Sequence, residues 1–161
     1  MFLTKKSTQK LKRLALKIKQ ANPEESKILL ELLKQGMISV KKSTKSEIEG
    51  YLTTAFQKYF QIMIMPNSTH VNHWTSPLKT ALKNIVRTNS SQWARGYVLT
   101  LEEIKDLVPE AKEEGFEEAF KHLKQLKLDY KTAREEFFNQ ELSLEDIFEY
   151  AGLELPKWEK Y

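Results

Sequence analysis

The spacing of apolar residues constrains this chain most, because it follows a helical period over most of the length. Leu11, Leu14 and Ile18 recur every three or four residues, and Leu78, Leu82 and their neighbours repeat the pattern, as in amphipathic helices. Glycine and proline, which punctuate many-stranded folds, number only five each among 161 residues. The sequence therefore predicts an all-α bundle of about six or seven helices.

Capping residues indicate where these helices begin and end. Asn22 before Pro23 is typical of a helix start, and Gly36 is typical of a helix end. That helix is expected to bury Ile28, Leu29, Leu32 and Leu33. The other expected helices cover about 5–21, 45–64, 77–88, 101–108, 110–138 and 144–151. Short capping-box sequences open three of them: Thr44 with Glu47, Thr100 with Glu103, and Ser143 with Asp146. The only β element that the sequence allows is a short hairpin near 37–42 or 96–99.

Length and composition are typical of one globular domain covering residues 1–161. The chain is 40% hydrophobic and 30% charged, and it has no cysteine. The lack of cysteine excludes disulfides and thiolate metal sites, and it favours a reducing, cytoplasmic location. Lysines interrupt the N-terminal apolar residues, so no secretory signal is expected. A mitochondrial presequence is the alternative, because no acid precedes Glu24. The most apolar stretch, Phe60 to Met65, is too short to span a membrane, so no membrane partner is expected.

Charge is strongly segregated along the chain, although the net charge is only +4. The basic N-terminal region, residues 1–46, has 12 Lys and Arg against 3 acids, whereas residues 100–161 have 9 against 17. The middle region, residues 50–101, contains no Asp or Glu at all, and the acidic C-terminal region begins at residue 102. Such asymmetry indicates either a nucleic-acid partner or complementary packing.

The basic and aromatic residues of the first two regions are the candidate nucleic-acid contacts. Lysine and arginine neutralise phosphates, and an exposed tryptophan can stack on a base. The alternative is that the lysines solvate helix faces while the tryptophans fill the core. The candidate set is Lys10, Lys12, Arg13, Lys17, Lys19, Lys41, Lys42, Lys45, Trp74, Lys79, Lys83, Arg87, Trp93 and Arg95.

Two segments resemble pieces of helix-turn-helix and winged-helix domains. KILLELLKQGMISVKK (27–42) is similar to the opening helix and turn of such a module. LTLEEIKDLVPEAKEEGFEEAFKHLKQLKLDY (99–130) is similar to a helix, a break and a recognition helix. The resemblance implies that Lys121, Lys124 and Lys127 face a DNA groove. Glu113 and the acids after it count against contact at the start of that helix.

No motif indicates catalysis or metal binding. His70 and His73 have a spacing found in metal sites, but the nearest carboxylates in the sequence are Glu49 and Glu102. There is no glycine-rich phosphate loop and no sequence typical of a hydrolase or metalloprotease. The expected protein is therefore not an enzyme and needs no cofactor.

The expected function is that of a non-catalytic accessory protein that binds DNA or RNA mainly through the phosphate backbone. The alternative is a helical adaptor or assembly subunit, which recognises an acidic protein surface or another copy of the chain. The apolar C-terminal residues are expected to dock on the protein's own core, the alternative being a partner protein. They are Leu153, Leu155, Pro156, Trp158 and Tyr161.

Overall fold

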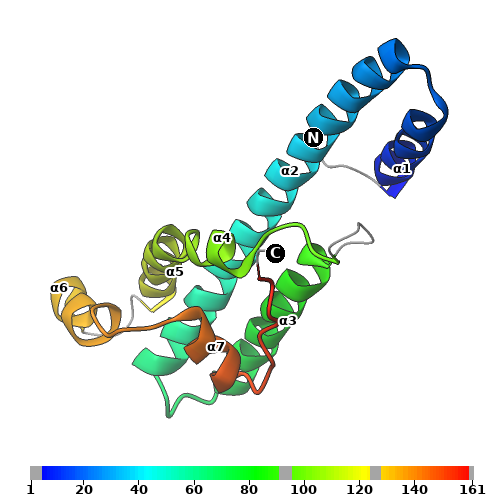
Figure 1. Cartoon of the computed structure of the whole chain (residues 1–161). Helices are drawn as coiled ribbons and strands as arrows, with labels where there is room; N and C mark the ends of the chain where they lie inside the picture. Colours follow the sequence, from blue (N-terminus) through cyan, green and yellow to red (C-terminus); the bar gives the residue numbers. More distant parts are fainter. Residues whose placement is uncertain (1–4, 91–95, 124–127, 160–161) are drawn as a thin grey trace. The chain divides into compact units, whose positions relative to one another are not determined.

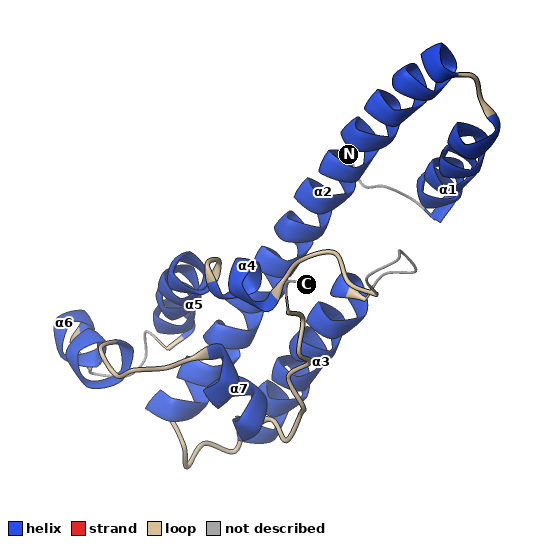
Figure 2. Ribbon diagram, viewed as in Figure 1, coloured by secondary structure: helices blue, strands red, loops and turns tan. Residues whose placement is uncertain are grey.

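The computed structural model describes residues 5–90, 96–123 and 128–159. Its contacts divide the chain into two compact units, Met1–Ser46 and Glu47–Tyr161. The first unit spans the same residues as the basic N-terminal region of the sequence. Helices make up most of the described residues, and the only β pairing among them is an isolated bridge between Ser90 and Tyr97 (Figure 2). The predicted all-α class is confirmed.

The helices are labelled in chain order in Figure 1. A π-helical turn, η1, directly follows α6. The bounds are α1 (Lys5–Gln20), α2 (Pro23–Ile64), α3 (Val71–Asn89), α4 (Leu101–Lys105), α5 (Val108–His122), α6 (Tyr130–Ala133), η1 (Arg134–Phe138) and α7 (Leu144–Tyr150).

The first unit consists of α1 and the beginning of α2, which run in opposite directions (Figure 1). Asn22 caps α2 as predicted, since its Oδ1 accepts a hydrogen bond from the Glu25 amide at 2.9 Å. The predicted end at Gly36 is wrong, because α2 continues through it. One glycine inside a helix costs only about 1 kcal/mol, and the leucines, lysines and methionine around it favour helix.

The continuity of α2 overturns two further expectations. Residues 37–42 are helical and form no hairpin, and no helix begins at Thr44. The expected burial is also only half right. Leu29 and Leu33 are half-buried, whereas Ile28 and Leu32 are exposed.

The second unit has an aromatic core between the later turns of α2 and α5. Phe56 and Phe60 of α2 are buried, and so is Phe116 of α5. The rings of Phe60 and Phe116 meet edge to face, with centroids 5.2 Å apart. Phe138 of η1 contacts both rings. This cluster joins three elements that are distant in the sequence.

Gly115 lets α5 approach α2 closely. A Cβ atom built at this position would lie 2.7 Å from Phe56 Cβ, 2.8 Å from the Gln57 amide nitrogen and 2.9 Å from the Thr53 carbonyl oxygen. Two of these atoms are backbone, which cannot move without moving the helix. A glycine that looks like a weak point for helix formation is therefore a requirement of packing.

Two helix boundaries differ from prediction. The helix expected over 77–88 begins earlier, because α3 starts at Val71 and includes Pro77. Val71 and Trp74 pack against the core, and this burial offsets the cost of a proline inside the helix. The single helix expected over 110–138 is also wrong. Helix α5 ends at His122, and Asp129 caps α6 through the Thr132 amide. Leu126, which belongs to the expected helix, lies outside the described residues.

The C-terminal segment confirms two predictions. Ser143 and Asp146 form the full capping box of α7, and Gly152 follows this helix with a φ of 68°. Trp158 is buried, and its carbonyl accepts a hydrogen bond from the Leu101 amide at 2.8 Å. The tail therefore docks on its own unit. Tyr161 lies outside the described residues.

We expect opposite effects from adding the same methyl group at two glycines. Gly115→Ala should destabilise the second unit by about 1–3 kcal/mol, because overpacking against the α2 backbone outweighs the gain in helix propensity. Gly50→Ala should stabilise the protein by about 0.5–1 kcal/mol, since nothing lies within 4 Å of its Cβ. Urea unfolding followed by circular dichroism measures both. Equal effects of the two substitutions would contradict the close contact.

Candidate nucleic-acid interface

Helix α3 has one apolar face and one basic face. Leu78, Ala81, Leu82 and Ile85 are buried, as the sequence predicts, and their spacing places them on one side of the helix. The opposite side is exposed and carries Lys79, Lys83 and Arg87, named here the α3 basic row. Burial of the apolar face therefore turns the basic row to solvent.

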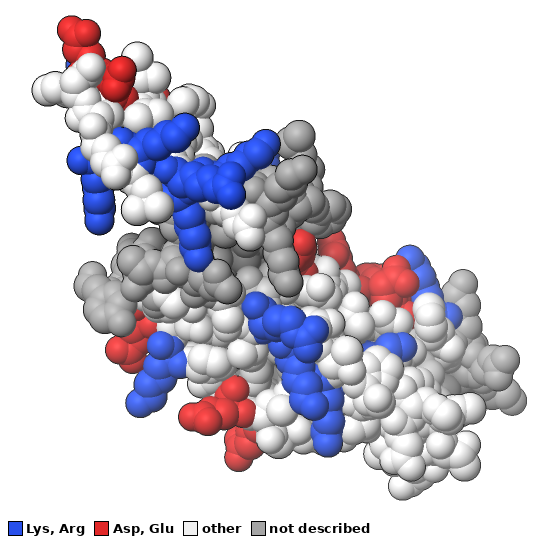
Figure 3. Space-filling model, turned by 90° about the vertical axis from the view of Figure 1, so that its right-hand side faces the viewer, with Lys and Arg blue, Asp and Glu red and all other residues white. Residues whose placement is uncertain are grey.

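The α3 basic row forms a short line of positive charge. Residues four apart on a helix are separated by about 6 Å along its axis, so the row spans about 12 Å. Helix α3 contains no Asp or Glu, and no ion pair joins the row to any acid in the described chain. Figure 3 shows basic side chains gathered over this area of the surface, next to uncharged residues. The positive charge of the α3 basic row is therefore only weakly neutralised by neighbouring acids.

The true start of α3 reveals two further polar residues on the same side. Asn72 and Ser76 are exposed and precede Lys79 by seven and three residues, which places them in line with the basic row. Amide and hydroxyl side chains commonly contact phosphates. The sequence contains this spacing, but the helix that it predicts begins at residue 77 and so excludes both Asn72 and Ser76.

The carboxyl end of α3 is held by a buried asparagine that sequence reasoning did not single out. Asn89 is fully buried, and its Oδ1 accepts a hydrogen bond from the Leu99 amide at 2.7 Å. Its Nδ2 donates to the Leu99 carbonyl at 2.9 Å. The Val98 amide donates to the Asn89 carbonyl at 3.0 Å. One side chain thus ties the segment before α4 to the end of the helix that carries the basic row.

Trp74 and the two histidines lie near the amino end of α3. Trp74 is half-buried and packs against the core, so only one portion of its ring is available for stacking. The His70 ring lies 6.0 Å from that of His73 and 6.1 Å from that of Trp74. No group of three metal-ligating side chains occurs among the described residues.

The other candidate contacts divide between the first unit and the residues that are not described. On α1, Lys12 is half-buried. The other four candidates on this helix are exposed: Lys10, Arg13, Lys17 and Lys19. On α2, Lys41, Lys42 and Lys45 are exposed. Trp93 and Arg95 lie outside the described residues. Within the second unit, the described candidates are therefore the α3 basic row and Trp74.

The resemblance to helix-turn-helix domains is wrong for the first segment, because 27–42 is one uninterrupted helix without a turn. In the second segment, α4 and α5 do form two helices with a short break between them. However, Lys121 is paired with Glu118 at 3.1 Å, and Lys124 and Lys127 lie outside the described residues. In the described chain, Lys121 of α5 is thus paired with an acid, whereas no ion pair joins the α3 basic row to an acid.

Some acidic side chains of the acidic C-terminal region form hydrogen bonds within the fold. Arg134 donates two parallel hydrogen bonds to Glu113, Nη1 to Oε1 at 2.7 Å and Nη2 to Oε2 at 2.8 Å. The guanidinium hydrogen bonds lower the pKa of Glu113 below its usual value. The guanidinium also lies over the Phe138 ring, 4.2 Å from its centroid. This bidentate pair fastens η1 to α5.

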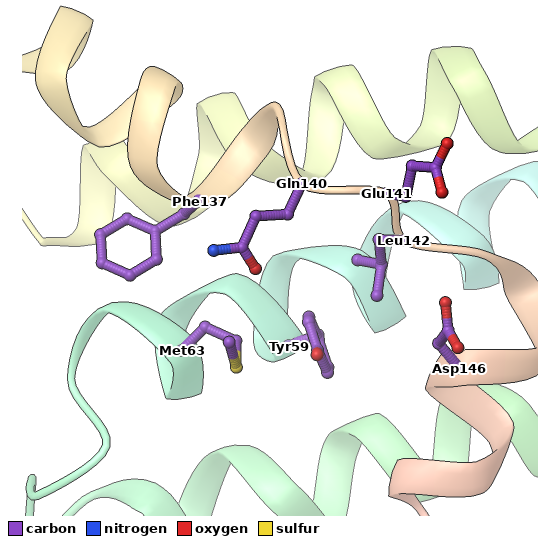
Figure 4. A pocket seen from close by; sticks show the side chains of 7 residues that line it. All are labelled: Tyr59, Met63, Phe137, Gln140, Glu141, Leu142 and Asp146. Carbon is purple, nitrogen blue, oxygen red and sulfur yellow. The ribbon is translucent and has the colours of Figure 1, made fainter.

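An open pocket of about 240 Å³ lies between α2 and the segment before α7. Figure 4 shows Tyr59 and Met63 on α2 opposite Gln140 and Leu142 of the segment before α7. Burial raises the pKa of Tyr59 above its usual value. Asp146, also in the lining, has a lowered pKa because it accepts a hydrogen bond from the Ser143 amide. Its carboxylate serves the helix cap and is a poor general base.

No protein family, curated protein or solved structure matches this chain. Within the described ranges, no helix is both long enough and apolar enough to cross a membrane.

Asn89→Ala should destabilise the second unit by about 2–4 kcal/mol, because the buried amide and carbonyl of Leu99 would each lose a hydrogen bond. Chemical denaturation gives the free energy of unfolding. Asn84→Ala, on the same helix and half-buried, is the matched control and should change it by less than about 0.5 kcal/mol. Similar losses in both variants would rule out a special role for Asn89.

The Glu113–Arg134 pair should make stability depend on pH in the acid range. Since the folded pKa of Glu113 is lowered, its contribution is fully present above the ordinary value of about 4.3 and is lost as pH falls through the folded pKa. Arg134→Gln should therefore flatten the decline of the melting temperature below about pH 4.3. Lys131→Gln, an exposed residue on α6 with the same change in charge, should leave the decline as steep as in the unmodified protein.

Proposed function

We propose that this protein is a non-catalytic accessory protein that binds DNA or RNA through the phosphate backbone, with the α3 basic row as the contact surface of its second unit. The observation that carries the proposal is the row itself. It comprises three exposed cations on one helix face that contains no acid. Asn72 and Ser76 extend the same face with hydrogen-bonding side chains.

The expected binding is electrostatic and not specific for sequence. Each phosphate neutralised by a cation releases condensed counterions, so affinity falls steeply with salt. Three contacts to duplex DNA give a slope of about −2.7 in log affinity against log salt, or a loss of about 40-fold between 50 and 200 mM. Lysine is a point charge that contacts phosphates without reading bases, which fits a backbone-binding role.

The first unit supplies a second group of cations to the same function. Helix α1 has no acid in its 16 residues, and its last turn ends with Lys17 and Lys19. Cations at the carboxyl end of a helix also complement its dipole, so some of this charge serves α1 itself. We expect α1 to add to the salt dependence that α3 establishes.

The test is a triple substitution of the α3 basic row, Lys79→Gln, Lys83→Gln and Arg87→Gln. Because all three side chains are exposed, the fold should persist while the salt slope becomes shallower by about 2.7 for duplex DNA and about 2.1 for a single strand. Fluorescence anisotropy with labelled DNA and RNA at about 50 and 200 mM salt measures the slope.

The matched control removes three exposed lysines elsewhere on the second unit: Lys105, Lys131 and Lys157, each changed to Gln. It alters the net charge equally, so it separates the local row from overall charge. Equal losses of affinity in both triple variants would contradict a site on α3. Lack of binding by the unmodified protein at the lower salt would refute the nucleic-acid function.

A further inference from the structure

The first unit holds most of the large apolar side chains that are exposed in the described chain. Of the seven large apolar side chains that are exposed in the described chain, only Tyr150 belongs to the second unit. Ile38, Ile28 and Leu16 are 67%, 65% and 62% exposed. The complete set in the first unit is Leu16, Ile28, Leu30, Leu32, Met37 and Ile38. Several exposed apolar residues within one short unit indicate an interaction surface.

Four of these residues, all on α2, make the apolar side of that helix too wide for one neighbouring helix. The half-buried residues Leu29, Leu33 and Val40 follow a single stripe, with spacings of four and seven. At about 100° per residue, Ile28 and Leu32 lie to one side of that stripe. Leu30 and Met37 lie to the other side by the same count.

These four exposed residues, Ile28, Leu32, Leu30 and Met37, are named here the flank residues. Together with the stripe they form an apolar arc of about 200°, roughly twice the width that a surface helix turns to its core. Such an arc requires more than one helical neighbour, and α1 is the only other helix among the described residues of the first unit.

The charges on the same stretch of α2 indicate what the other neighbour is. Glu24, Glu25 and Glu31 lie in its first nine residues, where Lys27 is the only cation. The following stretch, 32–46, carries four lysines and no acid: Lys34, Lys41, Lys42 and Lys45. Acids at the start of a helix complement its dipole, but the reversal of sign along one helix also makes the surface complementary to itself.

We propose that residues 23–46 of α2 pair with the same residues of a second copy of the chain, in antiparallel orientation. A two-fold axis brings the acidic end of each helix against the lysine-rich end of its partner, and the flank residues lie between these ends. Parallel pairing would set like charges against each other. This proposal develops the assembly-subunit alternative and is independent of nucleic-acid binding.

Analytical ultracentrifugation of the full chain, without nucleic acid, tests the pairing. We expect a mass of about twice 18.9 kDa at concentrations near 100 μM. Two double variants, Ile28→Gln with Leu32→Gln and Leu30→Gln with Met37→Gln, remove the two sides of the arc separately. At least one should raise the dissociation constant about tenfold or more, because buried apolar anchors dominate such interfaces. Tyr150→Gln is the control outside the unit and should have no effect.

Charge substitutions test the orientation. Glu24→Lys with Glu25→Lys should weaken the dimer, because lysines would then face lysines. Adding Lys42→Glu and Lys45→Glu to the same chain should restore the dimer, because the charges at the two ends of the helix are then exchanged. Restoration supports antiparallel pairing, and its failure would overturn that orientation.

A monomer at about 100 μM, or a dimer unaffected by both apolar double variants, would overturn the self-association. Since all four flank residues are exposed, circular dichroism should show unchanged helix content in these variants. The anisotropy measurement with nucleic acid remains separate, so loss of one function leaves the other measurable.

Discussion

The contact between α5 and α2 at Gly115 is the constraint on which the second unit depends. Because Gly115 has no side chain, the two helix backbones approach closely, and the adjacent Phe116 reaches the Phe60 ring. The same buried cluster includes Leu82 and Ile85 of α3. Helix α3 buries its apolar face in this cluster, and the α3 basic row on the opposite face is exposed.

Acids and bases have different roles in the second unit. Several acids are used internally: Glu113 holds Arg134, Glu145 pairs with Lys105, and Asp146 completes a helix cap. The α3 basic row has no such partner among the described residues. The segregation of charge along the chain thus has two consequences. Much of the acidic end supports the fold, and the basic surface is available to an anionic partner.

Nucleic-acid binding and pairing of α2 rely on different forces, and their main surfaces, the α3 basic row and residues 23–46, belong to different units. Binding of phosphates relies on screened charge, so it weakens with salt. Pairing of α2 relies mainly on apolar burial, and charge sets its orientation. A dimer would carry two α3 basic rows, and two linked contacts can raise affinity for one long nucleic acid well above that of a single row. Assembly and nucleic-acid binding are therefore compatible functions.

The sequence by itself determined the helical class, the caps at Asn22 and Ser143, and the inner and outer faces of α3. These features follow from local spacing and from hydrogen bonds within a few residues. The course of α2 through Gly36 follows from the strong helix formers around this glycine, which outweigh its cost of about 1 kcal/mol. Only the tertiary structure decided that α3 starts before Pro77. A proline costs a helix about 3 kcal/mol, and the burial of residues such as Val71 and Trp74 can offset this cost. That burial depends on contacts between distant residues, which a single sequence does not display.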